Sequence, residues 1–143
     1  MKKTLLTSLV LFFVVGIFAQ EQKDTSNILF NGQYMPAFKI TTMDGEELSS
    51  KDFKGKTVLI NFFATWCGPC RKELPHVQTD IWDKYKDNPD FVLLIISREE
   101  APAKVMPFVE KFEYPMTFYS DLDRSCYSKF AHKFIPRNYL FNE

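Results

Sequence analysis

The stretch "TVLINFFATWCGPCRKELP", residues 57–75, decides the fold of this chain. Its first eight residues, 57–64, are almost continuously apolar, and most of them are β-branched or aromatic. Such a run is typical of a strand that is buried on both faces of a parallel sheet. Two cysteines, Cys67 and Cys70, follow the run and are separated by two residues. We therefore expect a strand that is followed directly by a cysteine pair at the start of the next secondary-structure element.

The residues after the cysteine pair have the apolar spacing of a helix. Apolar side chains recur at intervals of three, four and four residues: Leu74, Val77, Ile81 and Tyr85. Pro75 lies inside this pattern. It should kink the helix, because proline lacks an N–H donor and its ring crowds the preceding turn.

The rest of the chain alternates between strand and helix patterns. Strands are expected within residues 36–48, on both sides of a turn at Asp44–Gly45, and over residues 91–97, 116–119 and 137–141. Helices are expected over residues 105–112 and 123–131. This alternation predicts an α/β fold in layers, with a central sheet that contains parallel pairs.

The first residues have the composition of a secretory signal peptide. Lys2 and Lys3 precede an apolar run over residues 5–18, and Ala19 is a small residue suited to cleavage. The run has 14 residues, whereas a membrane span needs ~20; an uncleaved anchor is the alternative. The expected organisation is a signal peptide over residues 1–19, a flexible polar lead over 20–35 and an exported domain over 36–143.

Composition and charge narrow the classes of partner. The chain has 143 residues, enough for one domain with one core. Without Lys2 and Lys3 it carries 16 basic and 18 acidic residues, and no basic stripe with interleaved aromatic residues appears. This pattern argues against a nucleic-acid partner. Export would place the cysteines where disulfides form and persist, with membrane contact only through the signal segment.

The position of the cysteine pair gives its two thiols different roles. At a strand-to-helix junction, the Cys67 sulfur meets unpaired N–H groups and the positive end of the helix dipole. Such sites can lower a thiol pKa to ~3.5–7.5, which favours the reactive thiolate. Cys70 lies one turn later, and Pro69 is tolerated between them because N–H groups of the first turn are unpaired anyway. We expect Cys67 to be the nucleophile and Cys70, which lies deeper, to be the resolving thiol.

Two other interpretations of the pair stay open at this point. Zinc sites use the same cysteine spacing, and the further candidate ligands are Cys126, His76 and His132. The chain has no second CxxC motif, which weakens this reading. A structural staple that closes so short a loop would stabilise little. Cys126, the third cysteine, is either a buried inert thiol or a free thiol able to pair with another molecule.

Three motifs together resemble the thioredoxin superfamily. Trp66-Cys67-Gly68-Pro69-Cys70 matches its WCGPC active site, Pro75 matches the proline of its active-site helix, and "FIPRNYLF", residues 134–141, matches its cis-proline segment. Residues 35–75, "MPAFKITTMDGEELSSKDFKGKTVLINFFATWCGPCRKELP", are more closely similar to the exported ResA/TlpA-like thiol-disulfide oxidoreductases. The resemblance covers residues 35–143 and implies a thioredoxin-like fold that lacks the family's last strand and C-terminal helix.

The resemblance also implies roles for individual residues. Pro136 would be the cis-proline that shapes the substrate groove and keeps the cysteine pair from capturing metal. Ile135 would offer backbone hydrogen bonds to a bound peptide, and Trp66 would flank the site. Glu73 lies three residues after Cys70 on the same helix, where it could accept the proton that Cys70 loses. Asn61 occupies the strand position at which cytoplasmic thioredoxins carry a buried aspartate.

The activity implied by the resemblance is thiol-disulfide exchange in the periplasm or cell envelope. No cofactor or metal is needed, and the partners would be substrate proteins with cysteine pairs and a membrane thiol that donates electrons. The CGPC sequence is similar to that of reducing thioredoxins, so we expect a reductase, with a role in cytochrome c maturation as one possibility. The alternatives are an oxidant or isomerase of the same fold, and a metal-binding module like a copper chaperone.

Overall fold

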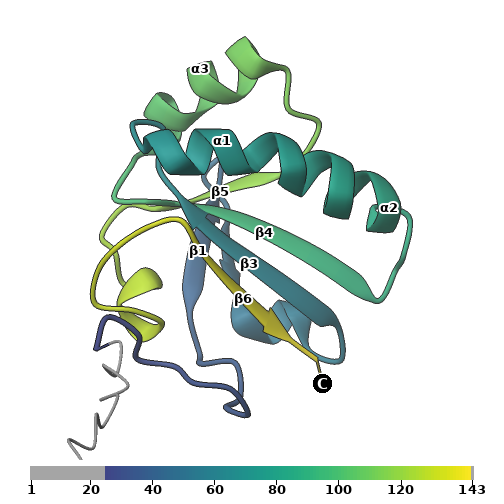
Figure 1. Cartoon of the computed structure of the whole chain (residues 1–143), viewed down its shortest axis with the longest axis vertical. Helices are drawn as coiled ribbons and strands as arrows, with labels where there is room; N and C mark the ends of the chain where they lie inside the picture. The colour runs from purple at the N-terminus through teal and green to yellow at the C-terminus, as the bar shows by residue number, and fades with distance from the viewer. Residues whose placement is uncertain (1–24, 143) are drawn as a thin grey trace, which may run out of the picture.

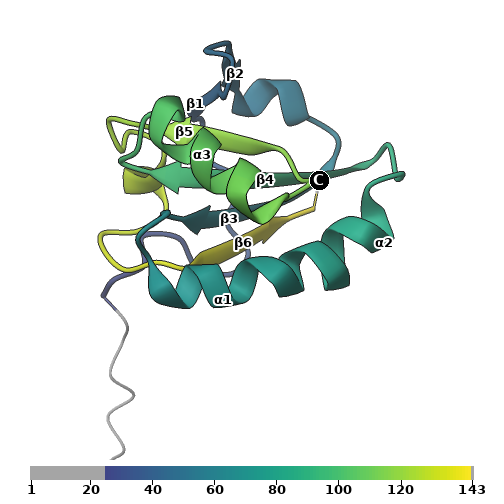
Figure 2. The ribbon, with the colours of Figure 1, turned by 90° about the horizontal axis from the view of Figure 1, so that it is seen from above.

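The computed structural model of this protein describes residues 25–142. The signal peptide expected over residues 1–19 lies outside the described residues, so that expectation stays a prediction. The described chain is built around one sheet whose two faces are covered by different kinds of segment (Figures 1 and 2). Within residues 25–142, no helix combines the length and the apolar character needed to cross a membrane.

Six strands form a single mixed sheet in the order β2-β1-β5-β4-β3-β6 (Figure 1). The strands are β1 (Lys39–Thr42), β2 (Glu47–Ser49), β3 (Thr57–Phe63), β4 (Phe91–Arg98), β5 (Phe118–Asp121) and β6 (Arg137–Phe141). β4 pairs in parallel with both β3 and β5, whereas the other pairings are antiparallel. This topology confirms the predicted α/β class with a central mixed sheet.

Two helices cover one face of the sheet (Figures 1 and 2). α1 (Gly68–His76) connects β3 to β4, and α3 (Pro102–Phe112) connects β4 to β5. Both helices link neighbouring parallel strands in the same direction across the sheet, so right-handed crossovers place them on the same face. Leu74 of α1 and Val105 of α3 are fully buried in one apolar cluster.

The helix after the cysteines changes type along its length. α1 is followed without interruption by a π-helical segment (Val77–Trp82) and then by α2 (Asp83–Tyr85). Pro75 lies inside α1, where it cannot donate a backbone hydrogen bond. The backbone adopts the wider π-helical geometry two residues later. Irregularities of this kind accompany helix bends, so the structure departs from regular α-helix where the sequence predicted a kink.

β3 carries the side chains that hold the two layers together. Its residues alternate between the faces of the sheet. Val58, Ile60 and Phe62 pack into one apolar cluster, and Phe63 packs into the other, beneath the two helices. Burying a side chain such as Phe62 contributes about 1.5–3 kcal/mol. Asn61 is also fully buried and faces α1 together with Phe63.

Short and irregular segments cover the opposite face. Phe62 meets the rings of Tyr127 and Phe130 edge-on, with ring centroids 5.2 and 5.1 Å away. The helix expected over residues 123–131 is reduced to a 3-10 turn, Tyr127–Lys129. The buried carboxylate of Asp121 accepts hydrogen bonds from the N–H groups of Cys126 and Tyr127 at 2.9 and 2.7 Å. These bonds fix the backbone in a non-helical approach to the turn.

Two expected elements shift by a few residues, whereas β6 matches the strand expected over 137–141. β5 lies two residues later than the strand expected over 116–119. α3 begins at Pro102, which occupies a first-turn position, and Pro107 lies inside the helix. The turn between β1 and β2 contains Gly45, whose φ of 92° suits glycine.

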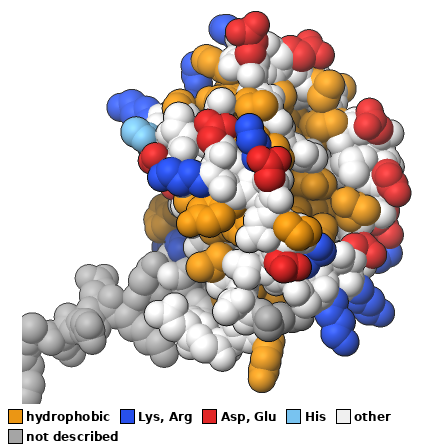
Figure 3. Space-filling model, turned by 90° about the vertical axis from the view of Figure 1, so that its right-hand side faces the viewer, with side chains coloured by type: hydrophobic (Ala, Val, Ile, Leu, Met, Phe, Trp, Pro, Cys, Tyr) orange, Lys and Arg blue, Asp and Glu red, His pale blue; other side chains and the backbone are white. Residues whose placement is uncertain are grey.

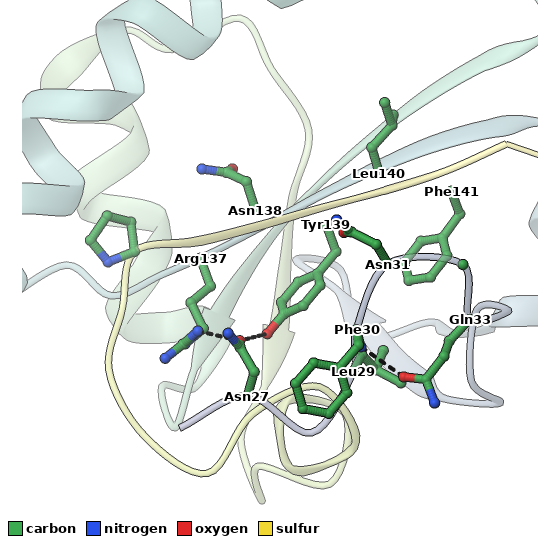
Figure 4. A pocket seen from close by; sticks show the side chains of 12 residues that line it. Asn27, Leu29, Phe30, Asn31, Gln33, Arg137, Asn138, Tyr139, Leu140 and Phe141 are labelled. Atoms are coloured by element: carbon green, nitrogen blue, oxygen red, sulfur yellow. Dashed lines mark hydrogen bonds between the residues drawn. The ribbon is translucent and has the colours of Figure 1, made fainter. Parts of the chain in front are cut away.

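The segment before β1 is attached to the sheet edge, which the sequence did not predict. Ile28 donates its N–H to the carbonyl of Phe130 at 2.9 Å. The side-chain oxygen of Asn27 accepts hydrogen bonds from Arg137 and from the Tyr139 hydroxyl of β6 (Figure 4). Ser26 is almost completely buried. The described part of the expected flexible lead is therefore fastened at this point, although it forms no helix or extended strand.

Several large apolar side chains stay on the surface. Figure 3 shows hydrophobic side chains gathered across the middle of one face, with charged side chains around them. The most exposed large apolar residues include Tyr34, Leu140, Phe134 and Trp66. Trp66 directly precedes the cysteine pair and Phe134 directly precedes Ile135, so two of these exposed rings belong to the candidate site.

Candidate active site

The first cysteine caps the N-terminus of α1. β3 ends at Phe63, and four residues later Cys67 occupies the N-cap position with an extended backbone. Its Sγ accepts a hydrogen bond from the N–H of Cys70 at 3.2 Å. Pro69 lies in the first turn, where its missing N–H costs no helical bond. This is the strand-to-helix junction that the sequence predicted, with the sulfur at the positive end of the helix.

The two cysteines form a disulfide in this structure. Their Cα atoms are 5.3 Å apart. Cys67 retains 5% of its surface exposed, and Cys70 retains none. An incoming sulfur can therefore approach Cys67 more easily than Cys70, whereas the roles of nucleophile and resolving thiol stay predictions.

The loop before β6 lies against the disulfide. The Ile135–Pro136 peptide bond is cis, as the resemblance implied. The Ile135 carbonyl oxygen lies 3.8 Å from the Cys67 Sγ. Ile135 is half-buried and packs against both apolar clusters, so the loop is anchored where it meets the cysteine. The structure thus brings Ile135, Pro136 and Cys67 together, whereas a peptide bound at Ile135 stays a prediction.

Glu73 is held by two amide side chains from the sheet. Asn61 of β3 donates its Nδ2 hydrogen to Glu73 Oε2 at 3.1 Å, and Asn138 of β6 donates to Oε1 at 2.6 Å. Asn61 and Asn138 are direct partners in the β3–β6 register and also share a hydrogen bond of 2.8 Å. The three side chains form a polar bridge from α1 to the edge strand. Glu73 is half-buried within it.

One acceptor in this bridge is unused. Asn61 Oδ1 is buried and has no hydrogen-bond partner among the described residues. A buried acceptor without a partner is costly, typically about 1–3 kcal/mol. An S–H group or a water that donates to Asn61 Oδ1 would relieve this cost. The bridge could therefore receive one further donor on the side of the sheet that α1 covers.

Glu100 is a second carboxylate next to the site, and the sequence analysis missed it. It follows β4 and is only 2% exposed. Its carboxylate accepts the N–H of Thr65 at 2.7 Å and the Thr65 hydroxyl at 2.6 Å. Thr65 lies two residues before Cys67, so Glu100 fixes the segment that leads into the active site. The available signal was its place at the carboxyl end of a parallel strand, where sites in α/β sheets gather.

The charge of Glu100 is stabilised despite its burial. Ser97 donates its hydroxyl to the carboxylate at 2.8 Å, and Lys104 forms an ion pair with it at 2.9 Å. Burial acts to raise the pKa of Glu100, but the hydrogen bonds from Thr65, Lys104 and Ser97 outweigh it. The pKa therefore lies below the usual value of a glutamate, and Glu100 is ionised at neutral pH.

Cys126 is remote from this chemistry. It is free, fully buried, and belongs to the apolar cluster on the face opposite α1. Burial, with a contribution from the Asp121 carboxylate, raises the pKa of the Cys126 thiol well above its usual range. Of the two interpretations drawn from the sequence, the structure favours the buried inert thiol.

The described part of the chain contains no cluster of side chains suited to bind a metal ion. No group of three histidine, cysteine or acidic side chains lies close enough to hold a metal ion between residues 25 and 142. His76 lies 3.8 Å from Asp80 on the exposed side of the helix. His132 lies on the loop that precedes Ile135.

Two surface grooves adjoin the cis-proline loop. One, of about 470 Å³, is lined by Cys67, Trp66 and residues of the loop. Trp66 is 59% exposed there, so it flanks the disulfide as the resemblance implied. The other groove, of about 550 Å³, runs along β6 beside the segment around Asn27 and contains no cysteine (Figure 4). The first groove is the candidate substrate site, because it exposes the reactive sulfur.

Comparisons with known proteins identify relatives of this chain. The thiol-disulfide oxidoreductase ResA of Bacillus cereus is 34% identical over 98 residues, which cover 68% of this chain and 53% of that protein. A solution structure from Bacteroides thetaiotaomicron, provisionally assigned as a protein disulfide isomerase, has a TM-score of 0.76 at 37% identity and covers 81% of this chain and 74% of its own. A thiol:disulfide interchange protein of the thioredoxin family from Chlorobium tepidum has a TM-score of 0.60 at 26% identity, with 76% and 77% covered.

These similarities confirm the thioredoxin-like fold, although the chain spans only about half the length of the first curated relatives that it matches. The family model described as Redoxin matches residues 30–143, a range that contains the cysteine pair, Glu73, Glu100 and the cis-proline loop. With the disulfide at the start of α1 and Pro136 opposite it, the chain belongs to the Redoxin family of thioredoxin-like proteins.

Proposed function

We propose that this protein is an exported thiol-disulfide oxidoreductase that reduces disulfides of proteins in the periplasm or cell envelope. The observation that carries the proposal is the Cys67–Cys70 disulfide at the N-terminus of α1, with only Cys67 accessible. Its relatives are named thiol-disulfide oxidoreductases. The CGPC sequence favours reduction over oxidation, and the resemblance to ResA/TlpA-like proteins supports export and a possible role in cytochrome c maturation.

The reaction would begin from the reduced pair. The Cys67 thiolate attacks one sulfur of the substrate disulfide, forms a mixed disulfide and releases the other substrate sulfur as a thiolate, which takes up a proton. Cys70 then loses its proton and attacks the Cys67 sulfur. The second substrate thiolate leaves, and the Cys67–Cys70 disulfide forms. Two electrons have passed to the substrate, and a membrane thiol donor would restore the pair by the same exchange in reverse.

Residues around the pair support each step. The helix N-terminus stabilises the Cys67 thiolate. Glu73 is half-buried, lies one turn after Cys70 and is fixed by Asn61 and Asn138, so it can accept the Cys70 proton directly or through a water. The Ile135 carbonyl beside Cys67 would hydrogen-bond the backbone of the bound substrate. No step needs a bound cofactor or metal.

Reduction of insulin by the purified chain tests the proposal. With dithiothreitol as electron donor, the wild-type protein should accelerate insulin precipitation, and Cys67→Ser should reduce the rate to that of dithiothreitol alone. Cys126→Ser is the matched control, because it removes a buried thiol that the mechanism does not use. Full activity of Cys67→Ser would refute the assignment of the nucleophile.

An oxidant or isomerase is the second candidate function. The similar structure from Bacteroides thetaiotaomicron, provisionally assigned as a protein disulfide isomerase, favours it. The equilibrium potential of the pair against glutathione separates the two directions. A value near −270 mV, that of thioredoxin, would support a reductase, whereas a value near −120 mV, that of DsbA, would support an oxidant. Stoichiometric zinc or copper in the purified reduced protein would instead support a metal-binding module.

A further inference from the structure

The groove that exposes Cys67 is positively charged. Three cationic side chains line it: Arg98 from the end of β4, Arg124 from the loop after β5, and Lys133 from the segment before Ile135. No aspartate or glutamate lines it among the residues that the structure describes. The chain as a whole has equal numbers of basic and acidic residues, so this local excess is a feature of the groove.

Aromatic rings hold the two arginines in place. The Arg98 guanidinium lies 5.1 Å from the centre of the Tyr127 ring and 5.8 Å from that of Trp66. The Arg124 guanidinium lies 5.2 Å from the centre of the same Tyr127 ring. Two like charges that share one buried tyrosine repel each other unless an anion lies near them. Their positions are fixed by packing, so little side-chain entropy remains to be lost when an anion binds.

The arginines keep bonding capacity for a further ligand. The side chain of Arg98 is 13% exposed and has one acidic neighbour, Glu99, at 3.0 Å from its Nε. Arg124 donates one Nη hydrogen to the His132 carbonyl. Its Nε is buried and has no hydrogen-bond partner within the described residues. The guanidinium pair is therefore only partly neutralised and partly hydrogen-bonded.

Tyr127 also fixes the far wall of the groove. Its hydroxyl donates to the carbonyl of Phe134. Phe134 has a φ of 71°, an uncommon value for a residue with a large side chain, and the residue is 63% exposed. The Lys133 Nζ lies 5.1 Å from the centre of the Phe134 ring. The groove thus presents an apolar surface and fixed cations on the same side as the reactive sulfur.

We propose that this groove selects disulfide-bearing protein segments with acidic side chains next to the cysteine. This inference rests on the proposed function and names its substrate class. A carboxylate within a few residues of the substrate disulfide would meet Arg98, Arg124 or Lys133 while Cys67 attacks the sulfur. Clustered charges in a groove raise encounter rates with opposite charges by ~10–1,000-fold, and salt suppresses this effect.

Matched peptides test the selection. Three peptides share one intramolecular disulfide and differ only in the residues that flank it, which are glutamate, glutamine or lysine. The reduced full chain is mixed with each peptide, and the second-order rate constant of peptide reduction is measured. We expect glutamate to exceed lysine by about tenfold at low ionic strength, and by about twofold in 0.5 M salt. Equal rates, or faster reduction of the lysine peptide, would overturn the proposal.

A pair of variants locates the charges responsible. Lys133→Gln should lower the rate ratio of glutamate to lysine peptides by about threefold. Lys84→Gln, which removes an exposed lysine from α2, should leave the ratio unchanged. If Lys133→Gln slows all three peptides by the same factor, the cation acts on the thiolate and not on the substrate, and the proposal fails.

A binding measurement keeps this inference separate from the proposed function. Analogues with serine in place of both cysteines cannot react, and their affinity for the oxidised protein reports charge selection alone. If no peptide is reduced, the proposed function fails. Charge selection then stands if the glutamate analogue binds more tightly than the lysine analogue, and falls if the two bind equally.

Discussion

Two carboxylates approach the cysteine pair from different sides. Glu73 follows Cys70 on α1 and accepts hydrogen bonds from two neutral amides while it remains half-buried. Glu100 follows β4 and is buried. Its carboxylate accepts hydrogen bonds from the backbone N–H and the hydroxyl of Thr65, just before Cys67, and from the Ser97 hydroxyl, and it forms an ion pair with Lys104. The first carboxylate has access to solvent, as the proposed proton acceptor for Cys70 would need. The second is fixed as an anion and positions the chain.

This comparison predicts its largest effect on stability at Glu100. Glu100→Gln should lower the free energy of unfolding by ~2–4 kcal/mol, because a buried anion with several donors is replaced by an amide that cannot accept them all. Denaturant unfolding followed by circular dichroism measures the loss. Glu110→Gln, an exposed change on α3, the helix that follows Glu100, is the control and should stay within about 0.5 kcal/mol of wild type. Equal losses in the two variants would contradict a positioning role.

Glu100 should also make the free energy of unfolding depend on pH. The folded state lowers the pKa of Glu100, so its contribution is present above the usual value of about 4.5 and is lost as the pH falls through the lower, folded value. Unfolding free energies measured at pH 7 and pH 3 should therefore differ less in Glu100→Gln than in the wild type. An identical difference in the two proteins would show that Glu100 does not titrate with folding.

Glu73 should affect chemistry more than stability. Glu73→Gln retains the shape of the side chain but leaves one amide donor of Asn61 or Asn138 without an acceptor. We expect the free energy of unfolding to fall by only about 1 kcal/mol. The rate at which Cys70 resolves a mixed disulfide should fall by at least tenfold at neutral pH, and should recover as the pH rises and the Cys70 thiol ionises without help.

A matched change of charge controls for the loss of a carboxylate. Asp83→Asn removes an exposed acidic group further along the same helical run. It should change neither the free energy of unfolding nor the rate at which Cys70 resolves a mixed disulfide. Titration of the two thiols in Glu73→Gln provides the decisive result. If both thiols titrate as in the wild type and the resolving rate is unchanged, Glu73 has only a structural role.

The contrast between the two carboxylates also explains what could be predicted from the sequence. Glu73 lies three residues from Cys70, so helical spacing alone places it near the pair. The β3 run, the CxxC spacing and the two prolines predicted the junction and the cis-proline loop for the same reason, since each is a local pattern or a familiar motif. Thr65 and Glu100, in contrast, are far apart in the sequence, so no local pattern indicates that they are in contact. The parallel pairing of β3 and β4 brings them together.

The cationic groove was not predicted either, because its residues are also far apart in the sequence. Arg98, Arg124 and Lys133 come from three separate segments of the chain. Tyr127 packs against Phe62 of β3 and contacts both arginines, which no local sequence pattern indicates. The short 3-10 turn that carries Tyr127 replaced an expected helix, since Asp121 captures the N–H groups at its start. Tertiary hydrogen bonds of this kind override local propensity and leave no periodic signal in the sequence.

The smallest expected effect concerns the ion pair of Glu100. Lys104 Nζ lies 2.9 Å from the carboxylate, but its side chain is 59% exposed while that of Glu100 is 1% exposed. Lys104→Gln should therefore cost about 0.2–1 kcal/mol, because solvent screens the pair and the lysine must be ordered to form it. Most of that cost should disappear in 1 M salt, where the screening length falls to about 3 Å. Thr65 and Ser97 would still satisfy the carboxylate. If Lys104→Gln instead costs as much stability as Glu100→Gln, the contribution of Glu100 comes from the ion pair and not from its hydrogen bonds to Thr65. The proposed role of Glu100 in positioning the segment before Cys67 would then be wrong.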